Sequence, residues 1–276
     1  MTSTGLPLPS LAAAEASGDA IRARPSGYLR DVATVAGRAL RQVPREPASV
    51  LPAVFVPAFF YAVNLGALER LAPSSVDYKA FLLPMAIAFA VTGMSRAPSL
   101  VTDIQSGYFD RLCMTPVRRG ALLAGLMVAD VAVVVALCLP VLVVGFSVGV
   151  GFRTGFLGVL AFVGFSALWG FAFTGFPYAV ALRTGSPAAV NACFVAFFPF
   201  FFLTDGLAPR HALTGWFSAI ATYNPITYLL GALRELISGG WQPGALLQGL
   251  LAVAGIAVVS MSLALLALRS RVRHAA

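Results

Sequence analysis

Long apolar runs separated by short polar segments dominate the chain. Six runs stand out: Ser49–Leu68, Ala80–Ala97, Ala121–Phe146, Gly155–Leu182, Ala188–Leu203 and Gly244–Leu268. Most reach the roughly 20 residues that a helix needs to cross a hydrocarbon core about 30 Å thick. The apolar residues are continuous and do not alternate with period two, which excludes a transmembrane barrel. The pattern predicts an all-α polytopic membrane protein with six transmembrane helices, the second and fifth short enough to be broken or tilted.

Composition agrees with this fold class. Hydrophobic residues make up 59% of the chain and charged residues 11%, whereas soluble domains carry about 25% charged residues. With the N-terminus in the cytosol, 14 of the 19 basic residues fall on the cytosolic side, as the positive-inside rule requires. We therefore expect both termini in the cytosol of a bacterial cell and the protein in its plasma membrane. The net charge of +8 then indicates topology and contact with anionic lipid, and no nucleic-acid partner.

The N-terminal region divides into two parts before the membrane domain of residues 47–276. Residues 1–25 are rich in Ala, Ser and Pro, which predicts a flexible cytosolic tail. Within residues 26–46, apolar residues from Tyr28 to Val43 recur at helical spacing, and Arg30, Arg38 and Arg41 lie on the other side. This predicts an amphipathic helix in the membrane interface. Whether it is only an anchor or also touches a cytosolic partner stays open.

The loop between the second and third runs is unusually polar. Asp103, Gly107 and Arg111 are spaced four residues apart, which predicts one charged helical face. Pro116 is expected to end that helix. An ordinary solvated loop is the alternative interpretation.

The connection between the fifth and sixth runs carries a second polar motif. Tyr223, Asn224 and Pro225 predict a turn that begins a short helix, and that helix carries Arg234 and Glu235. It is too short to span, so we expect re-entrant or interfacial helices on the extracellular side, packed against protein. If the two charges lie at lipid depth, they must be paired or face water. They are candidates for an extracellular gate between two protomers, and a cap without a transport role is the alternative.

Few polar residues lie inside the apolar runs. Asp130 lies in the third run, where a charge costs about 2.5 to 3.5 kcal/mol on insertion scales, so we expect it to face protein or water. Arg96, at the inner end of the second run, is its candidate partner. Asp130 either connects helices or lies on the transport pathway. The same two interpretations apply to Asn64 and Asn191. The fifth run is rich in phenylalanines, which form either a packing surface or an aromatic route for the cargo. In the fourth run, Gly164, Gly170 and Gly175 permit close approach of a neighbouring helix.

Several kinds of chemistry are excluded. Lys79 is the single lysine and follows no glycine-rich loop, so the chain lacks the phosphate-binding loop of an ATPase. It has two histidines and no carboxylate cluster, so neither a metal site nor a hydrolase triad is expected. Cys113, Cys138 and Cys193 have no disulfide or ligand spacing.

Together the two polar motifs resemble those of ABC type-2 exporter membrane subunits. Asp103, Gly107, Arg111 and Pro116 match the loop before a Gly-rich third span, and Tyr223-Asn224-Pro225 with Arg234 matches the motif before the sixth. The resemblance runs from Tyr28 to Arg271, with Cys113-Met114 as a departure, and is closest to the drug-resistance (daunorubicin-type) branch.

This resemblance implies a permease that exports an apolar or amphipathic cargo: a drug, an antibiotic or a lipid. It implies a homodimer or a second permease, surrounding lipid, and separate ATPase subunits that hold ATP and magnesium and receive the loop as a coupling helix. The chain itself would bind no cofactor and catalyse no reaction. Export of a lipid-linked glycan or glycolipid is the alternative within the family. An ion-coupled secondary carrier, or a membrane scaffold or sensor without transport activity, are the alternatives outside it.

Overall fold

The structure, a computed structural model, describes residues 27–43, 47–71, 76–93, 95–108, 111, 119–209 and 212–274. All regular elements in these ranges are helical. They are α2 (Tyr28–Gln42), α3 (Pro47–Leu68), η2 (Glu69–Leu71), α4 (Tyr78–Thr92), α5 (Ala97–Gln105), α7 (Arg119–Ser147), α8 (Gly155–Thr184), α9 (Pro187–Phe202), α10 (Gly215–Tyr223), α11 (Pro225–Arg234), the π-helical turn η4 (Glu235–Gly239) and α12 (Pro243–His274). The predicted tail, residues 1–25, lies outside the described residues.

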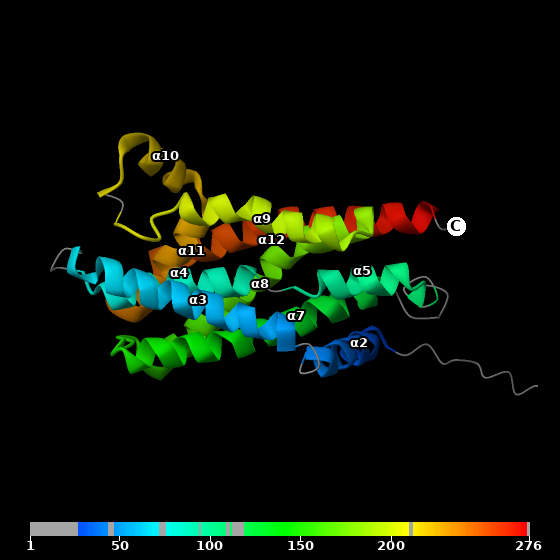
Figure 1. Cartoon of the computed structure of the whole chain (residues 1–276), viewed down its shortest axis with the longest axis horizontal. Helices are drawn as coiled ribbons and strands as arrows, with labels where there is room; N and C mark the ends of the chain where they lie inside the picture. The colour runs from blue at the N-terminus through cyan, green and yellow to red at the C-terminus, as the bar shows by residue number, and fades with distance from the viewer. Residues whose placement is uncertain are drawn as a thin grey trace, which may run out of the picture.

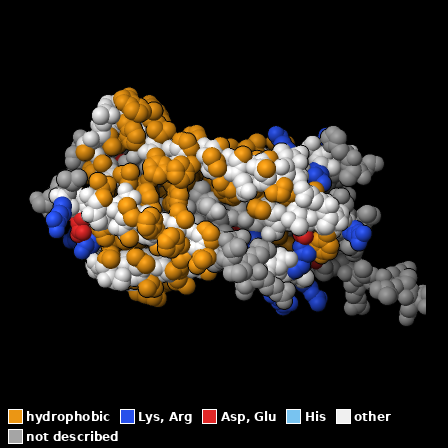
Figure 2. All heavy atoms as spheres, viewed as in Figure 1, with side chains coloured by type: hydrophobic (Ala, Val, Ile, Leu, Met, Phe, Trp, Pro, Cys, Tyr) orange, Lys and Arg blue, Asp and Glu red, His pale blue; other side chains and the backbone are white. Residues whose placement is uncertain are grey.

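The long helices form an elongated bundle (Figure 1). α2, α5 and the end of α12 lie at one end of it, called here the α2 end, and α10 lies at the opposite end, the α10 end. Apolar side chains cover the middle of the face in Figure 2, and the basic side chains gather at the two ends. A bundle with an apolar middle and charged ends matches the dimensions and polarity of a bilayer.

Among the residues that the structure describes, five segments are long and apolar enough to cross a membrane. They are Leu51–Leu68, Tyr78–Gln105, Gly120–Ser147, Gly155–Thr184 and Pro243–Arg271. The all-α, polytopic prediction is therefore confirmed. The remaining predicted span, the fifth, corresponds to α9, which has only 16 residues, so the count of six stays a prediction. The second predicted span is broken, as its sequence indicated: α4 ends at Thr92 and α5 begins at Ala97.

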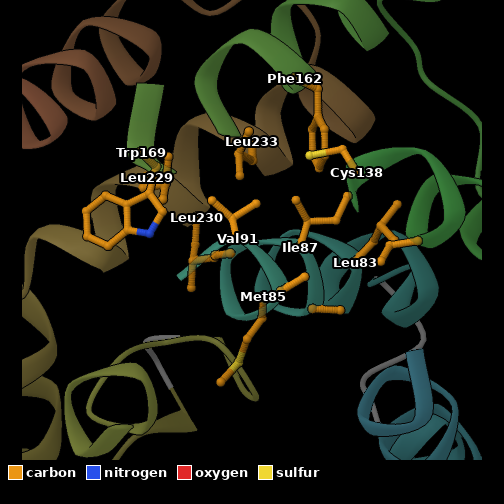
Figure 3. Packing of buried hydrophobic residues seen from close by; sticks show 14 of the residues in the cluster. Leu83, Met85, Ile87, Val91, Cys138, Phe162, Trp169, Leu229, Leu230 and Leu233 are labelled. Carbon is orange, nitrogen blue, oxygen red and sulfur yellow. The ribbon is translucent and has the colours of Figure 1, made fainter. Parts of the chain in front are cut away.

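α4 lies at the centre of the core. Its leucines and its Ile87 and Val91 are almost fully buried, and it contacts α3, α7, α8 and α11. Figure 3 shows these side chains meeting Cys138 of α7, Phe162 of α8 and the leucines of α11. α11 is thus an inserted helix that packs against protein, as expected of a short segment that does not span the membrane.

α2 packs against the α2 end of α7. Ala36 and Ala39 are buried, and a Cβ on Gly125 of α7 would lie 2.6 Å from Val35 Cβ. Arg30 and Arg41 are exposed. The predicted helix therefore exists and has two unlike faces, but much of its apolar face is covered by α7 rather than left for lipid.

Candidate functional site

A buried polar cluster lies at the joint between α4 and α5. The carboxylate of Asp130, on α7, is 2% exposed. It accepts hydrogen bonds from the main-chain N–H of Arg96 at 2.8 Å, from the Tyr178 hydroxyl at 2.8 Å and from Ser95 Oγ at 3.4 Å. Three donors satisfy a carboxylate that would otherwise be costly at this depth. Asp130 therefore connects α7, α8 and the start of α5.

The Arg96 hydrogen bond has a local structural reason. Arg96 is the N-cap of α5, and its own side chain caps nothing. The first N–H groups of a helix have no partner within the helix, and a carboxylate near them is favourable. Asp130 supplies that carboxylate from a neighbouring helix. The Arg96 guanidinium donates a hydrogen bond to the carbonyl of Ala39 in α2.

The segment predicted to couple to the ATPase differs from its prediction in shape. α5 ends at Gln105, and Gly107 has φ +69°, a left-handed conformation that favours glycine. Asp103, Gly107 and Arg111 therefore do not line one continuous helical face, and that expectation is wrong. Arg111 is exposed, and Pro116 lies outside the described residues.

Asp103 forms an ion pair within the chain. Its Oδ2 lies 2.8 Å from Nη2 of Arg38 on α2. The guanidinium carbon of Arg38 also lies 4.6 Å from the centre of the Tyr108 ring. The neighbouring Gln105 donates a hydrogen bond at 3.0 Å to the carbonyl of Gly185, at the turn between α8 and α9. The end of α5 is thus held on both sides.

The polar motif at the α10 end forms an extended network. Arg234 Nη1 lies 3.2 Å from Oδ1 of Asp205, and both side chains are nearly buried. Arg234 also donates hydrogen bonds to the carbonyls of Phe81, Asp205 and Gly206, and its guanidinium carbon lies 3.6 Å from the centre of the Phe81 ring. Arg234 thus pairs with Asp205, and Glu235 begins η4. The gate role expected of Arg234 and Glu235 stays a prediction.

Asn224 joins α9 to α11. Its side-chain oxygen accepts a hydrogen bond from the N–H of Ile226 and so caps α11, in which Pro225 occupies the first turn. Its side-chain nitrogen donates to the carbonyls of Phe200 and Leu203 at 2.7 and 2.9 Å. The predicted turn and helix start are therefore present. Tyr223, in contrast, is 88% exposed.

The remaining polar candidates lie apart from these clusters. Asn64 donates a hydrogen bond to the Phe60 carbonyl of its own helix, and Asn191 is exposed on α9. Neither contacts Asp130 among the interactions that the structure describes.

A pocket of about 190 Å³ opens beside the joint. Its walls are Phe89, Thr92 and Gly93 from the α4 side and Phe194, Val195, Phe197, Phe198 and Phe201 from α9. Val195 and Phe198 are largely exposed, so the pocket reaches the surface of the bundle. Part of the phenylalanine cluster of the fifth apolar run is therefore packed against α4, and part of it borders an open, apolar space.

The sequence indicated Arg96 as a partner of Asp130, which it contacts through its main-chain N–H, but the other partners in these clusters were missed. Tyr178 could have been noticed as a hydroxyl within an apolar span, and Asp205 as the one acidic residue besides Glu235 between the fifth and sixth runs. Arg38 was assigned to lipid headgroups. No group of three or more His, Cys, Asp or Glu side chains that could hold a metal exists among the described residues. Cys138 and Cys193 are free thiols, and Cys113 lies outside the described residues.

These features define a class: an all-helical, multi-pass membrane protein with a broken second span and an inserted, capped helix before the last one. Residues 30–237 match the model of the family described as "ABC-2 type transporter". The chain belongs to this family, and as such it is a membrane permease component. Family membership implies association with an ABC ATPase subunit.

Curated relatives come from the drug-resistance branch. The chain is 32% identical over 219 residues to the daunorubicin resistance ABC transporter permease protein DrrB1 of Streptomyces coeruleorubidus, with 74% of each chain covered. It is 26% identical over 226 residues to the probable doxorubicin resistance ABC transporter permease protein DrrC of Mycobacterium tuberculosis, with 80% of this chain and 82% of the relative covered. The resemblance found in the sequence is thereby confirmed.

Proposed function

We propose that this chain is the permease of an ATP-driven exporter for amphipathic drugs that carry a flat aromatic ring system, such as daunorubicin and doxorubicin. The observation that carries the proposal is the pocket between α4 and α9, which five phenylalanine side chains line. Aromatic rings bind other rings through offset-stacked or edge-to-face contacts. The anthracycline names of the relatives agree with such a pocket.

The polarity of the pocket argues against the glycolipid alternative. A sugar headgroup needs many hydrogen-bond partners, because a polar group buried without one is costly. Thr92 supplies the only side-chain hydroxyl among the lining residues. That hydroxyl already accepts a hydrogen bond from Trp169 Nε1 and donates one to the Ala88 carbonyl. The pocket therefore suits a ring system better than a glycan.

The size of the pocket supports a permease that works as a pair. Drug-sized sites usually enclose about 300 to 1,000 Å³, and one chain provides about 190 Å³. The exposed side chains of α9 border the open side. A second permease chain, identical or related, would complete the site from that side, so the proposal includes a homodimer or a paired permease.

ATP is hydrolysed elsewhere in the complex. The chain contains no phosphate-binding loop, so the energy comes from an ATPase subunit that holds ATP and magnesium. The polar segment after α5, with Arg111 exposed on it, is the docking element that we propose for that subunit. Because basic residues concentrate at the α2 end, that end faces the cytosol, and the cap formed by α10, α11 and Arg234 closes the pathway on the outside.

Binding of doxorubicin to the purified chain tests the pocket. Phe198 and Phe200 lie on the same helix and are 48% and 54% exposed, but only Phe198 lines the pocket. We expect Phe198→Ala to weaken binding about tenfold, equivalent to about 1.4 kcal/mol, measured by doxorubicin fluorescence with the chain in lipid nanodiscs. Phe200→Ala is the matched control and should bind as the wild type does. Equal effects of the two changes would contradict the pocket assignment.

A further inference from the structure

The short helix α5 is separated from the helix that precedes it. α4 ends at Thr92 with Gly93 as its C-cap, and α5 begins at Ala97 with Arg96 as its N-cap. Asp130, from α7, caps the restart through the N–H of Arg96. A helix that begins anew and is capped by another element can change its angle to α4 without losing its own hydrogen bonds.

Both ends of α5 are attached to α2. At the first end, the Arg96 guanidinium donates a hydrogen bond to the Ala39 carbonyl. At the other, Asp103 forms its ion pair with Arg38. The two contacts fall on consecutive residues of α2, and Arg38 also stacks on Tyr108, just beyond the end of α5. Two contacts fix both the position and the angle of α5 relative to α2, whereas a single contact would allow α5 to pivot.

We propose that the Arg38–Asp103 pair sets the position of α5 on α2, and that Asp103 is a positioning residue that acts through Arg38. This inference rests on the proposed function and refines its coupling step. The carboxylate of Asp103 is engaged within the chain, so its contribution to coupling is to keep α5 on α2. Arg111, which is exposed, remains the charge available to the ATPase subunit.

The joint also reaches the pocket. Thr92 and Gly93, the last residues before the break, line the pocket wall. At the far end of α5, Gln105 contacts the carbonyl of Gly185 at the turn that leads into α9. A displacement of α5 would therefore act on both walls of the pocket, through the joint on one side and through the start of α9 on the other.

An exchange of the charges of Arg38 and Asp103 distinguishes a positioning role of Asp103 from direct contact between Asp103 and the ATPase subunit. The variants are Arg38→Asp, Asp103→Arg and the double change, each in the complex with its ATPase subunit. The readouts are recovery of the ATPase with the tagged permease, and doxorubicin transported per ATP hydrolysed. We expect each single variant to keep the ATPase bound and to lower the transport ratio about two- to fivefold, the size expected of one partly exposed ion pair. The double variant should recover most of the wild-type ratio.

Two results would overturn the inference. One is a double variant no better than the poorer single variant. The other is loss of the ATPase from Asp103→Arg alone, which would mean that Asp103 itself contacts that subunit. Arg41→Asp is the matched control, because Arg41 lies exposed on the same helix. Combined with Asp103→Arg, Arg41→Asp should not restore the transport ratio. Restoration by this combination would also contradict a specific pair of Arg38 with Asp103.

A failure of the proposed function is distinguishable from a failure of this inference. If the wild-type complex does not transport doxorubicin, the drug assignment fails, and the pair is then tested by the ATPase rate of the complex without cargo. The single variants should shift that rate, and the double variant should return it to the wild-type value. A rate that stays shifted in the double variant would overturn the inference regardless of cargo.

Discussion

Arg234 on α11 and Asp205 in the segment after α9 form a nearly buried ion pair, with Nη1 and Oδ1 separated by 3.2 Å. The pair connects two elements that the sequence separates by 29 residues. The guanidinium also lies over Phe81 of α4 and donates to three carbonyls. One side chain thus holds the inserted helix, the loop after α9 and the central helix together.

Removal of either partner should destabilise the α10 end. A buried charge that loses its partner costs about 3–5 kcal/mol, so Arg234→Ala and Asp205→Ala should each lower the thermal unfolding midpoint of the purified chain in detergent. Arg234→Lys should give an intermediate loss, because an ammonium keeps the charge but cannot match the planar set of guanidinium donors.

The double variant tests whether the two residues act together. Arg234→Ala with Asp205→Ala should cost clearly less than the sum of the single losses. Glu235→Ala is the neighbouring control and should change the midpoint little. Strict additivity, or a Glu235→Ala loss equal to that of Arg234→Ala, would show that the ion pair does not hold this end together.

The hydrogen bond between Tyr178 and Asp130 permits a conservative test of the joint. Tyr178→Phe removes the hydroxyl and leaves the ring, so about 1.5–3 kcal/mol of stability should be lost, as for other hydrogen bonds to charged groups. Asp130→Ala should cost more, because it also removes the cap of α5. The free energy of unfolding, measured by denaturant titration in mixed micelles, ranks the two variants. A Tyr178→Phe chain as stable as the wild type would contradict the contact.

Close packing of α8 on α12 makes a further prediction. A Cβ on Gly175 would lie 2.5 Å from the main-chain carbon of Ser260, whose hydroxyl donates to the Ala172 carbonyl of α8. Gly175→Ala must therefore move the helices apart, at a cost of about 1–3 kcal/mol. Gly164→Ala on the same helix meets nothing within 4 Å and should be neutral or slightly stabilising. Equal unfolding midpoints for the two variants would contradict this packing.

Much of the fold could be predicted because apolar length and turn chemistry are local properties. The long runs, the break in the second one and the helix that begins at Asn224-Pro225 all follow from residues close together in the chain. The side-chain pairings could not be predicted in the same way. Arg38 with Asp103, and Arg234 with Asp205, depend on how helices far apart in sequence pack against one another. Glu235 was the nearest acid in sequence to Arg234, and tertiary packing placed Asp205 there instead.

The surroundings of α2 could not be predicted from its sequence either. Its helical spacing predicted two faces, and a face of arginines suggested lipid headgroups. Sequence spacing cannot tell whether an apolar face meets lipid or protein, because both favour the same residues. Gly125 of α7 permits the close approach of Val35, and that small residue on another helix decides the outcome.

Orientation in the membrane is tested by cysteine labelling from outside. In a background without native cysteines, Asp77→Cys and Tyr223→Cys should react with an impermeant thiol reagent in intact cells, because both positions are exposed, Asp77 at the start of α4 and Tyr223 at the end of α10. Arg183→Cys, exposed near the α2 end, should react only after permeabilisation. Labelling of Arg183→Cys in sealed cells would contradict the cytosolic placement of the α2 end.

ATP-driven doxorubicin uptake into inside-out membrane vesicles tests the central proposal most directly. The vesicles carry the full chain together with the ATPase subunit that co-purifies with it. We expect doxorubicin to accumulate with ATP and magnesium, to fail to accumulate with a non-hydrolysable ATP analogue, and to be reduced by Phe198→Ala but not by Phe200→Ala. Vesicles that accumulate no doxorubicin, or that accumulate it under a proton gradient without ATP, would contradict an ATP-driven drug exporter.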